Sequence, residues 1–201
     1  MFVFDNYYTP SELAHLTISL VLTKLFYPGA TLIRRPFIMR GRPRFSYGKG
    51  FTTGRACRLE TFGRKQDLKK KLVLGENVHI GDYVHIAAAD EITLGDNCLL
   101  ASHVFISDLD HGDYSDVADC TRPDSDPSCR PLHTAPVHIG SNVWIGEGVC
   151  ILKGVTIGDG CVIGARSIVT KDLPEGSIAV GAPARVVKSF DPESGTWNRS
   201  N

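Results

Sequence analysis

A six-residue period in the second half of the chain places the strongest constraint on its fold. One branched aliphatic residue recurs at every sixth position, in the series Ile139, Ile145, Ile151, Ile157, Ile163 and Val169. An α-helix has 3.6 residues per turn and a plain strand alternates every two residues, so neither explains this period. Each hexad therefore predicts one short flat strand and a corner. Three hexads would close a triangular coil, and burying each aliphatic side chain stabilises it by about 1.5–3 kcal/mol.

The same period occurs earlier, at Leu74, Ile80 and Leu94, each followed by glycine. It predicts an all-β solenoid in which each coil buries the next. We expect an appendage over residues 1–44, the solenoid over 45–174, and an exit strand and tail over 175–201. The period breaks between Ile106 and Ile139, which predicts a loop extruded over residues 107–137. Long loops in compact domains are usually functional.

The segment before the solenoid has the pattern of a capped helix. Thr9, Pro10 and Glu12 form a capping-box sequence with proline in the first turn. Apolar residues follow at helical spacing: Leu13, Leu16, Leu20, Val21, Leu25 and Phe26. We expect this helix to pack on the solenoid or on a neighbouring subunit. The alternative is a helix on a membrane surface, because five arginines follow that suit anionic lipid, a solvated face or substrate phosphates: Arg34, Arg35, Arg40, Arg42 and Arg44.

Charge and cysteine usage exclude several classes of protein. Lysine plus arginine and aspartate plus glutamate each number 22, so a dedicated nucleic-acid binder is not expected. No segment reaches the length of about 18 apolar residues that a membrane span needs. The first ten residues lack the basic start of a signal peptide. The six cysteines form no CxxC pair and predict reduced thiols in the cytoplasm, although Cys120 and Cys129 remain able to pair.

His111 is the strongest catalytic candidate of the seven histidines. It lies at the mouth of the extruded loop, where Asp108, Asp110 and Asp113 are close enough in sequence to orient an imidazole. A base that works near neutral pH is most often a histidine, because its unperturbed pKa is about 6.5. We expect His111 to be a general base, and Asp108 and Asp110 to contact the substrate.

Residues 104–115, with the sequence VFISDLDHGDYS, resemble the catalytic loop of the hexapeptide-repeat O-acetyltransferases. The likeness is greatest to enzymes that modify lipopolysaccharide O-antigen and capsular sugars, and galactoside and maltose acetyltransferases are more distantly similar. It extends over about residues 45–188, including residues 167–174 (SIVTKDLP) and 181–185 (GAPAR). The resemblance implies a left-handed parallel β-helix, a homotrimer, acetyl-CoA as co-substrate, no required metal, and His111 as base. Relatives often carry a second histidine where this chain has Leu109.

The resemblance also implies which residues bind the two substrates. Those that match the family's CoA contacts are Trp144, Ala165, Thr170, Lys171, Arg185 and Lys188. His85 stands where galactoside-type relatives carry an acceptor-lining tyrosine. The alanines at positions 87–89 replace an asparagine of those relatives, which argues against a simple galactoside as acceptor.

The expected activity is transfer of acetyl from acetyl-CoA to a sugar hydroxyl in surface-polysaccharide synthesis, in the cytoplasm or at the inner face of its membrane. Three alternatives remain. One is N-acetylation of an amino sugar or antibiotic. Another is a metalloenzyme like the γ-class carbonic anhydrases, for which His133 and His138 have ligand-type spacing. The third is a non-catalytic trimeric scaffold.

Overall fold

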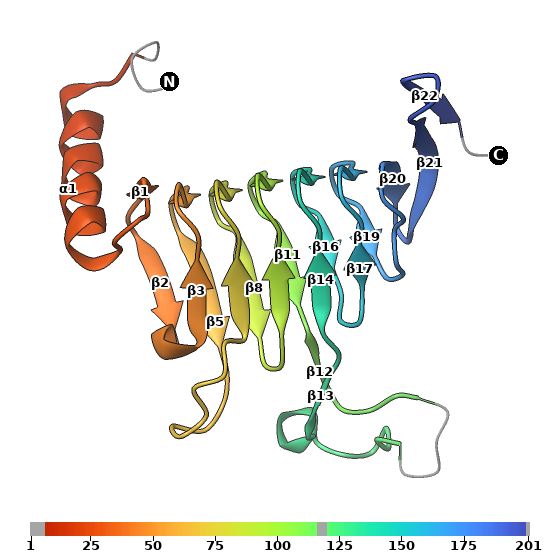
Figure 1. The fold of residues 1–201 in the computed structure, drawn as a ribbon. Helices are drawn as coiled ribbons and strands as arrows, with labels where there is room; N and C mark the ends of the chain where they lie inside the picture. The colour runs from red at the N-terminus through yellow and green to blue at the C-terminus, as the bar shows by residue number, and fades with distance from the viewer. Residues whose placement is uncertain (1–6, 116–119, 200–201) are drawn as a thin grey trace.

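The computed structural model describes residues 7–115 and 120–199. These residues form a left-handed parallel β-helix with helix α1 (Pro10–Phe26) at one end and a projecting hairpin at the other (Figure 1). A long arm leaves one edge of the prism between these ends. The all-β solenoid predicted from the six-residue period is confirmed.

Three sheets make up the sides of the prism. The first contains β1 (Leu32–Ile33), β4 (Thr52–Thr53), β7 (His79–Ile80), β10 (Leu99–Leu100), β15 (Trp144–Ile145), β18 (Val162–Ile163), β20 (Ser177–Gly181), β21 (Ala184–Asp191) and β22 (Thr196–Arg199). The second contains β2 (Phe37–Arg40), β5 (Cys57–Thr61), β8 (His85–Ala88), β11 (Phe105–Ser107), β16 (Cys150–Ile151) and β19 (Ile168–Val169). The third contains β3 (Phe45–Tyr47), β6 (Leu72–Leu74), β9 (Ile92–Leu94), β14 (Val137–Ile139) and β17 (Thr156–Ile157). We call them the first, second and third sheets.

The core is a stack of the repeat aliphatics along the axis of the prism. In the second sheet, Leu59, Ile86 and Ile106 occupy one register line and are fully buried. Ile151 and Val169 continue this line in the next two coils. The strands are short because each side of the triangle holds only the few residues between two corners.

The repeat glycines are required mainly by the close approach of neighbouring coils. A Cβ on Gly48 would lie 2.7–2.8 Å from backbone atoms of Gly75 and Glu76 in the next coil, which no side chain could accommodate without movement. The left-handed backbone conformations occur two residues further on, for example at Asn77, whose φ is 54°. Coil spacing and corner geometry thus constrain different positions of the hexad.

The β-helix begins earlier than residue 45, the start expected from the sequence. Strand β1 pairs in parallel with β4, and β2 pairs with β5 over four positions. Residues 32–44, including the short 3₁₀ helix η1 (Arg42–Arg44), therefore supply the first two sides of the first coil, and β3 supplies the third. The six-residue pattern is hidden here because the aliphatic-glycine pairs of later coils are absent.

Helix α1 has the expected capping box, with Thr9 accepting from the backbone of Glu12 and the Glu12 carboxylate accepting from the backbone of Thr9. Its contact with the β-helix differs from the expected apolar one. Thr23 and Ser19 are the buried residues of the helix, and their hydroxyls accept from the backbone amides of Ile33 (2.8 Å) and Arg35 (3.2 Å). The helix thereby satisfies amide groups beside the terminal strand β1.

The apolar stripe of α1 consequently stays at the surface of a single chain. Five of its members are exposed: Leu13, Leu20, Val21, Leu25 and Phe26. In the described residues, no helix is both long and apolar enough to cross a lipid bilayer.

The extruded loop and the C-terminal segment contain more structure than the sequence predicts. Strands β12 (Leu109–His111) and β13 (Leu132–Thr134) pair antiparallel and form the base of the arm, and η2 (Pro127–Cys129) lies further along it. Residues 191–201 have the composition of a loose tail, yet β22 pairs antiparallel with β21. Trp197 packs edge-on against Phe190 in this hairpin, with ring centroids 5.4 Å apart.

Candidate active site

A cleft of about 470 Å³ lies where the base of the arm meets the second sheet. The arm contributes Leu109, Asp110 and His111, and the sheet contributes Arg58, Glu60, His85 and Phe105. Lys153, from the turn after β16, lines the same cleft. The structure therefore brings together three of the residues expected at the site, namely His85, Asp110 and His111.

His111 ends strand β12 and is exposed to solvent. Its backbone carbonyl accepts a hydrogen bond from the Tyr114 hydroxyl (2.6 Å), and Arg130 donates to that same hydroxyl (2.7 Å). These bonds fix the backbone at His111. In the described residues the imidazole itself has no hydrogen-bond partner. Its nitrogen atoms are therefore available to a bound substrate.

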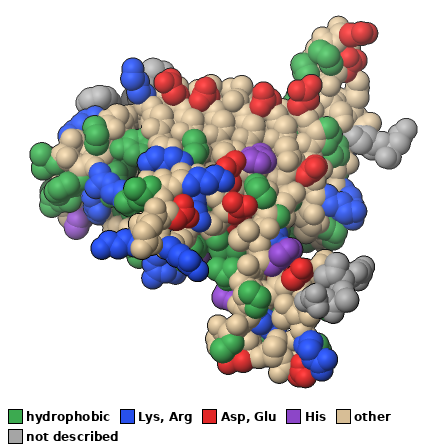
Figure 2. Space-filling view, turned by 60° about the horizontal axis from the view of Figure 1, so that its bottom comes forward, with side chains coloured by type: hydrophobic (Ala, Val, Ile, Leu, Met, Phe, Trp, Pro, Cys, Tyr) green, Lys and Arg blue, Asp and Glu red, His purple; other side chains and the backbone are tan. Residues whose placement is uncertain are grey.

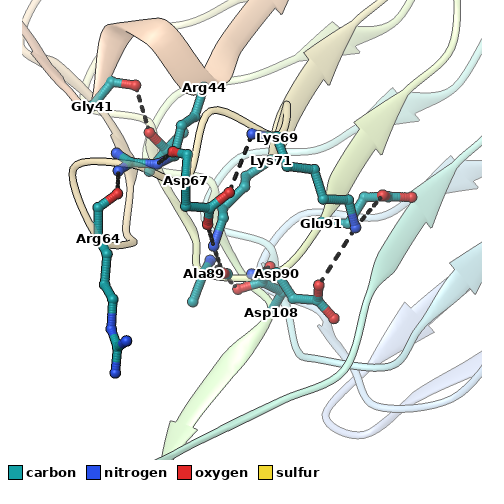
Figure 3. Close-up of polar contacts among 11 residues, drawn as sticks. Gly41, Arg44, Arg64, Asp67, Lys69, Lys71, Ala89, Asp90, Glu91 and Asp108 are labelled. Atoms are coloured by element: carbon teal, nitrogen blue, oxygen red, sulfur yellow. Dashed lines mark hydrogen bonds and ion pairs between the residues drawn. The ribbon is translucent and has the colours of Figure 1, made fainter.

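Asp108 is buried at the start of the arm, which differs from the expectation that it contacts substrate. Its two carboxylate oxygens accept from the backbone amides of Ala89 (2.7 Å) and Asp90 (2.8 Å), as Figure 3 shows. Burial raises the pKa of this carboxyl above its ordinary value, although the amide bonds act in the opposite direction. With no exposed surface and both oxygens occupied, Asp108 is an anchor for the arm.

The anchor continues into a neighbouring loop. Lys71 donates to the carbonyl of Ala89 (2.6 Å) and forms an ion pair with Asp67 (3.0 Å). Arg44, which is also buried, donates to the carbonyl of Asp67 (2.6 Å). These contacts connect the loop between β5 and β6 to the origin of the arm (Figure 3).

Lys153 connects the arm to the coil that follows it. Its ammonium lies 3.3 Å from the Asp110 carboxylate and 2.8 Å from Nδ1 of His133. Asp110 and His133 are opposite one another in the β12–β13 pair. One lysine therefore holds both strands of the arm beside His111.

His85 lies on the floor of the cleft and pairs with Glu60, a residue that the sequence analysis missed. Nε2 of His85 is 3.1 Å from Oε2 of Glu60, and the ring packs against Phe105 with centroids 5.4 Å apart. Glu60 follows Leu59 at the hexad position where Gly81 and Gly95 follow their aliphatic residues. A carboxylate at a small-residue position was the available signal.

A second hollow, of about 590 Å³, lies on the first sheet and is lined by Trp144, His79, Arg34, Leu99 and Glu147, among others. Trp144 is 52% exposed there. It stands on β15, whereas His111 is on the arm beside the second sheet. Within one chain, these two residues therefore lie on different faces of the prism.

The two histidines with metal-ligand spacing, His133 and His138, lie in different parts of the structure. His138 is 2.9 Å from the Thr93 hydroxyl and belongs to the third sheet, whereas His133 belongs to the arm. These two histidines do not converge on one point in the described chain. All six cysteines are free thiols, including Cys120 and Cys129.

Comparison with known proteins identifies the family. Residues 136–171 match the family model described as bacterial transferase hexapeptide (six repeats). The chain is 36% identical over 185 residues to the putative lipopolysaccharide biosynthesis O-acetyl transferase WbbJ of Escherichia coli K12, covering 92% of each chain. This protein belongs to the hexapeptide-repeat acetyltransferases. The solved structure of a galactoside acetyltransferase in complex with coenzyme A is 26% identical, with a TM-score of 0.56, over 94% of this chain and 76% of that one.

A further structural likeness is to AntD, an N-acyltransferase from Bacillus cereus solved with dTDP and 3-hydroxybutyryl-CoA. It has a TM-score of 0.66 and 22% identity, over 94% of this chain and 92% of that one. At this identity the likeness concerns the fold. As an acyltransferase of the hexapeptide-repeat family, the chain uses acetyl-CoA as its donor.

The residues expected to hold CoA in this acetyltransferase are distributed over two faces. Ala165 lies in the corner between β18 and β19, and Thr170 and Lys171 follow β19 of the second sheet. Arg185 and Lys188 lie on β21 in the first sheet, and both are exposed. A single chain of the enzyme does not gather this set into one pocket.

Proposed function

We propose that this protein transfers the acetyl group of acetyl-CoA to a sugar hydroxyl during synthesis of a surface polysaccharide. The observation that carries the proposal is the unpartnered imidazole of His111, held by its backbone in an open cleft. The likeness to WbbJ over 92% of the chain supports a lipopolysaccharide-type glycan as the acceptor.

In the proposed reaction His111 takes the proton of the acceptor hydroxyl. The oxygen attacks the thioester carbonyl, a new ester bond forms, and the carbon–sulfur bond breaks. His111 then gives the proton to the departing CoA thiolate, so that the imidazole returns to its starting state. Direct transfer needs no acyl-enzyme intermediate, and positioned proton transfer contributes about 10²–10⁴-fold to such reactions.

The active assembly in this proposal is a homotrimer. His111 and Trp144 lie on different faces of one chain, and a neighbouring subunit would place one chain's arm beside another chain's first sheet. The groove between subunits would then gather the CoA residues Trp144, Ala165, Thr170, Lys171, Arg185 and Lys188.

His85 and Asp110 are the proposed acceptor contacts in the cleft. Lys and Arg side chains gather beside the arm over the N-terminal coils (Figure 2). This charge suits an acceptor that carries phosphate, as a nucleotide-linked or lipid-linked sugar does. We place the enzyme in the cytoplasm, with the exposed apolar stripe of α1 resting on the inner face of the membrane.

N-acylation of an amino sugar is the second candidate. It is favoured by the fold shared with AntD, whose structure contains dTDP and an acyl-CoA. An amine that attacks a thioester must also lose a proton, so the same cleft would serve both reactions.

The test is thiol release from acetyl-CoA with a panel of free, nucleotide-linked and lipid-linked sugars, followed by NMR of the product. Hydroxyl-dependent release with an O-acetyl product is the expected result. Release that requires an amino sugar and yields an amide would reject O-acetylation and support N-acylation. Absence of release with every acceptor, together with no binding of CoA in calorimetry, would reject both.

A further inference from the structure

The carboxylate of Glu60 is buried beneath the floor of the cleft and has three partners. The side chain is 3% exposed. Arg58 donates to Oε2 at 2.6 Å and Arg40 lies 3.3 Å from Oε1. Nε2 of His85 approaches the same Oε2 at 3.1 Å. The two guanidinium groups already supply enough positive charge to neutralise this carboxylate. Charge neutralisation therefore does not require the contact with the His85 imidazole.

Glu60 is ionised in this arrangement. Burial on its own would raise the pKa of the Glu60 carboxyl, but hydrogen bonds from Arg58 and His85 and the charges of Arg58 and Arg40 together hold it below its ordinary value. An ionised carboxylate can only accept hydrogen bonds. The atom of His85 that faces it, Nε2, must therefore carry a proton.

A neutral imidazole with its proton on Nε2 has an unprotonated Nδ1. In the described residues Nδ1 of His85 has no partner, and the ring is one of the groups that line the cleft. The contact with Phe105 restricts rotation of the ring. The nitrogen that remains available to a ligand is thus a hydrogen-bond acceptor.

We propose that Glu60 is a positioning residue that fixes His85 in the Nε2–H form, so that Nδ1 accepts a hydrogen bond from a hydroxyl of the acceptor sugar. The inference rests on the proposed function, because it places the acceptor in this cleft. It assigns the cleft a preference for sugars with a free hydroxyl at that point, beside the hydroxyl that reacts with His111. Deoxy or capped sugars at this position would leave Nδ1 unpaired and bind more weakly.

The test compares wild type with Glu60→Met, which keeps a side chain of similar length but removes the acceptor that faces Nε2 of His85. The tautomer is read by two-dimensional ¹H–¹⁵N NMR of ¹⁵N-histidine-labelled protein, with the His85 signals assigned from the loss of peaks in His85→Gln. Arg40→Gln is the matched control, because it removes a partner of Oε1 and leaves the oxygen that meets His85. Steady-state kinetics with the acceptor identified in the panel complete the comparison.

The expected result is the Nε2–H form in wild type and in Arg40→Gln, and a loss of this preference in Glu60→Met, with the Nδ1–H form populated. The KM for the acceptor should rise about tenfold or more in Glu60→Met, with the KM for acetyl-CoA changed less than about twofold. A wild-type His85 with its proton on Nδ1 would overturn the proposal whether or not any variant folds. Loss of kcat without any change in tautomer or acceptor KM would show a merely structural role and overturn it as well.

Failure of the proposed function gives a different pattern. If the acceptor proves to be an amine, or if His111 proves dispensable, the tautomer measurement still reports on Glu60 and His85. If the tautomer is wrong while O-acetylation depends on His111, only the role of Glu60 is rejected.

Discussion

Lys153 donates a hydrogen bond of 2.8 Å to Nδ1 of His133, and this bond joins the body of the β-helix to the arm that carries His111. The same ammonium pairs with Asp110 at 3.3 Å. An arm attached to the prism only through its two ends would leave the imidazole loosely placed. The lysine holds both strands at their base, so the position of His111 depends on a residue in a different coil.

Replacing Lys153 with methionine should lower activity more than stability. The methionine keeps most of the length of the side chain and removes the charge, so the arm loses its clamp while the coil keeps its packing. Because small misplacements of reacting groups are costly, we expect kcat to fall about tenfold or more, with the melting temperature nearly unchanged. Lys69→Met is the control, since Lys69 pairs with Asp90 and Glu91 away from the cleft. Equal kinetic effects of the two substitutions would contradict the clamp.

Asp108→Ala should destabilise the fold, because it leaves the amides of Ala89 and Asp90 without their buried acceptor. Each such loss costs about 1–3 kcal/mol, so a total on the order of 2–6 kcal/mol is expected in denaturant unfolding. Asp110→Ala is the comparison, because that carboxylate is 47% exposed and should matter little for stability. If Asp108→Ala unfolds at the wild-type denaturant concentration, the carboxylate is not an anchor.

Thr23→Val tests the docking of helix α1. Valine has nearly the same shape as threonine, but it cannot accept from the amide of Ile33, and a buried N–H group would lose its partner. The expected cost is about 1–2 kcal/mol. Thr17→Val is a matched control on the same helix, because its hydroxyl bonds only to Leu13 within the helix and is exposed. The docking account fails if the two substitutions change stability equally.

The pH dependence of stability should reveal the state of Glu60. Its pKa is depressed in the folded protein, whereas an unfolded glutamate titrates near about 4.3. A depressed pKa stabilises the fold fully above the unfolded value, and this contribution is lost as the pH falls through the folded value. The stability difference between wild type and Glu60→Gln should therefore be constant near neutral pH and shrink as the pH falls below about 4.3. A difference that stays constant down to pH 3 would mean that Glu60 is not ionised in the fold.

The coils could be predicted from the sequence because their period is local. The side chain at each sixth position points into the prism, and a glycine beside it allows the coils to stack. Both features can be recognised within a short stretch of sequence. Residues 32–44 could not be assigned to the β-helix in this way, since β1 and β2 lack the aliphatic-glycine pairs. The left-handed sense and the CoA donor came from resemblance to a family and not from the period.

The cleft was predictable only in part. His111 is marked by its place at the break in the repeat, and His85 by its match to a known acceptor position. Glu60 contacts a residue 25 positions away in the sequence, and Lys153 contacts one 20 positions away. Neither contact is local, so no local sequence pattern predicts it. The docking of α1 through Thr23 was hidden for a related reason, because hydropathy identifies apolar stripes and not hydroxyls that satisfy a strand edge.

The central claim is that the imidazole of His111 is the general base, and the most direct test is the rate of His111→Ala beside wild type with one fixed acceptor. The account predicts a fall in kcat of about 10²-fold or more, a nearly unchanged KM for acetyl-CoA, and an unchanged unfolding transition. A variant that acetylates the same hydroxyl at the wild-type rate would contradict the account.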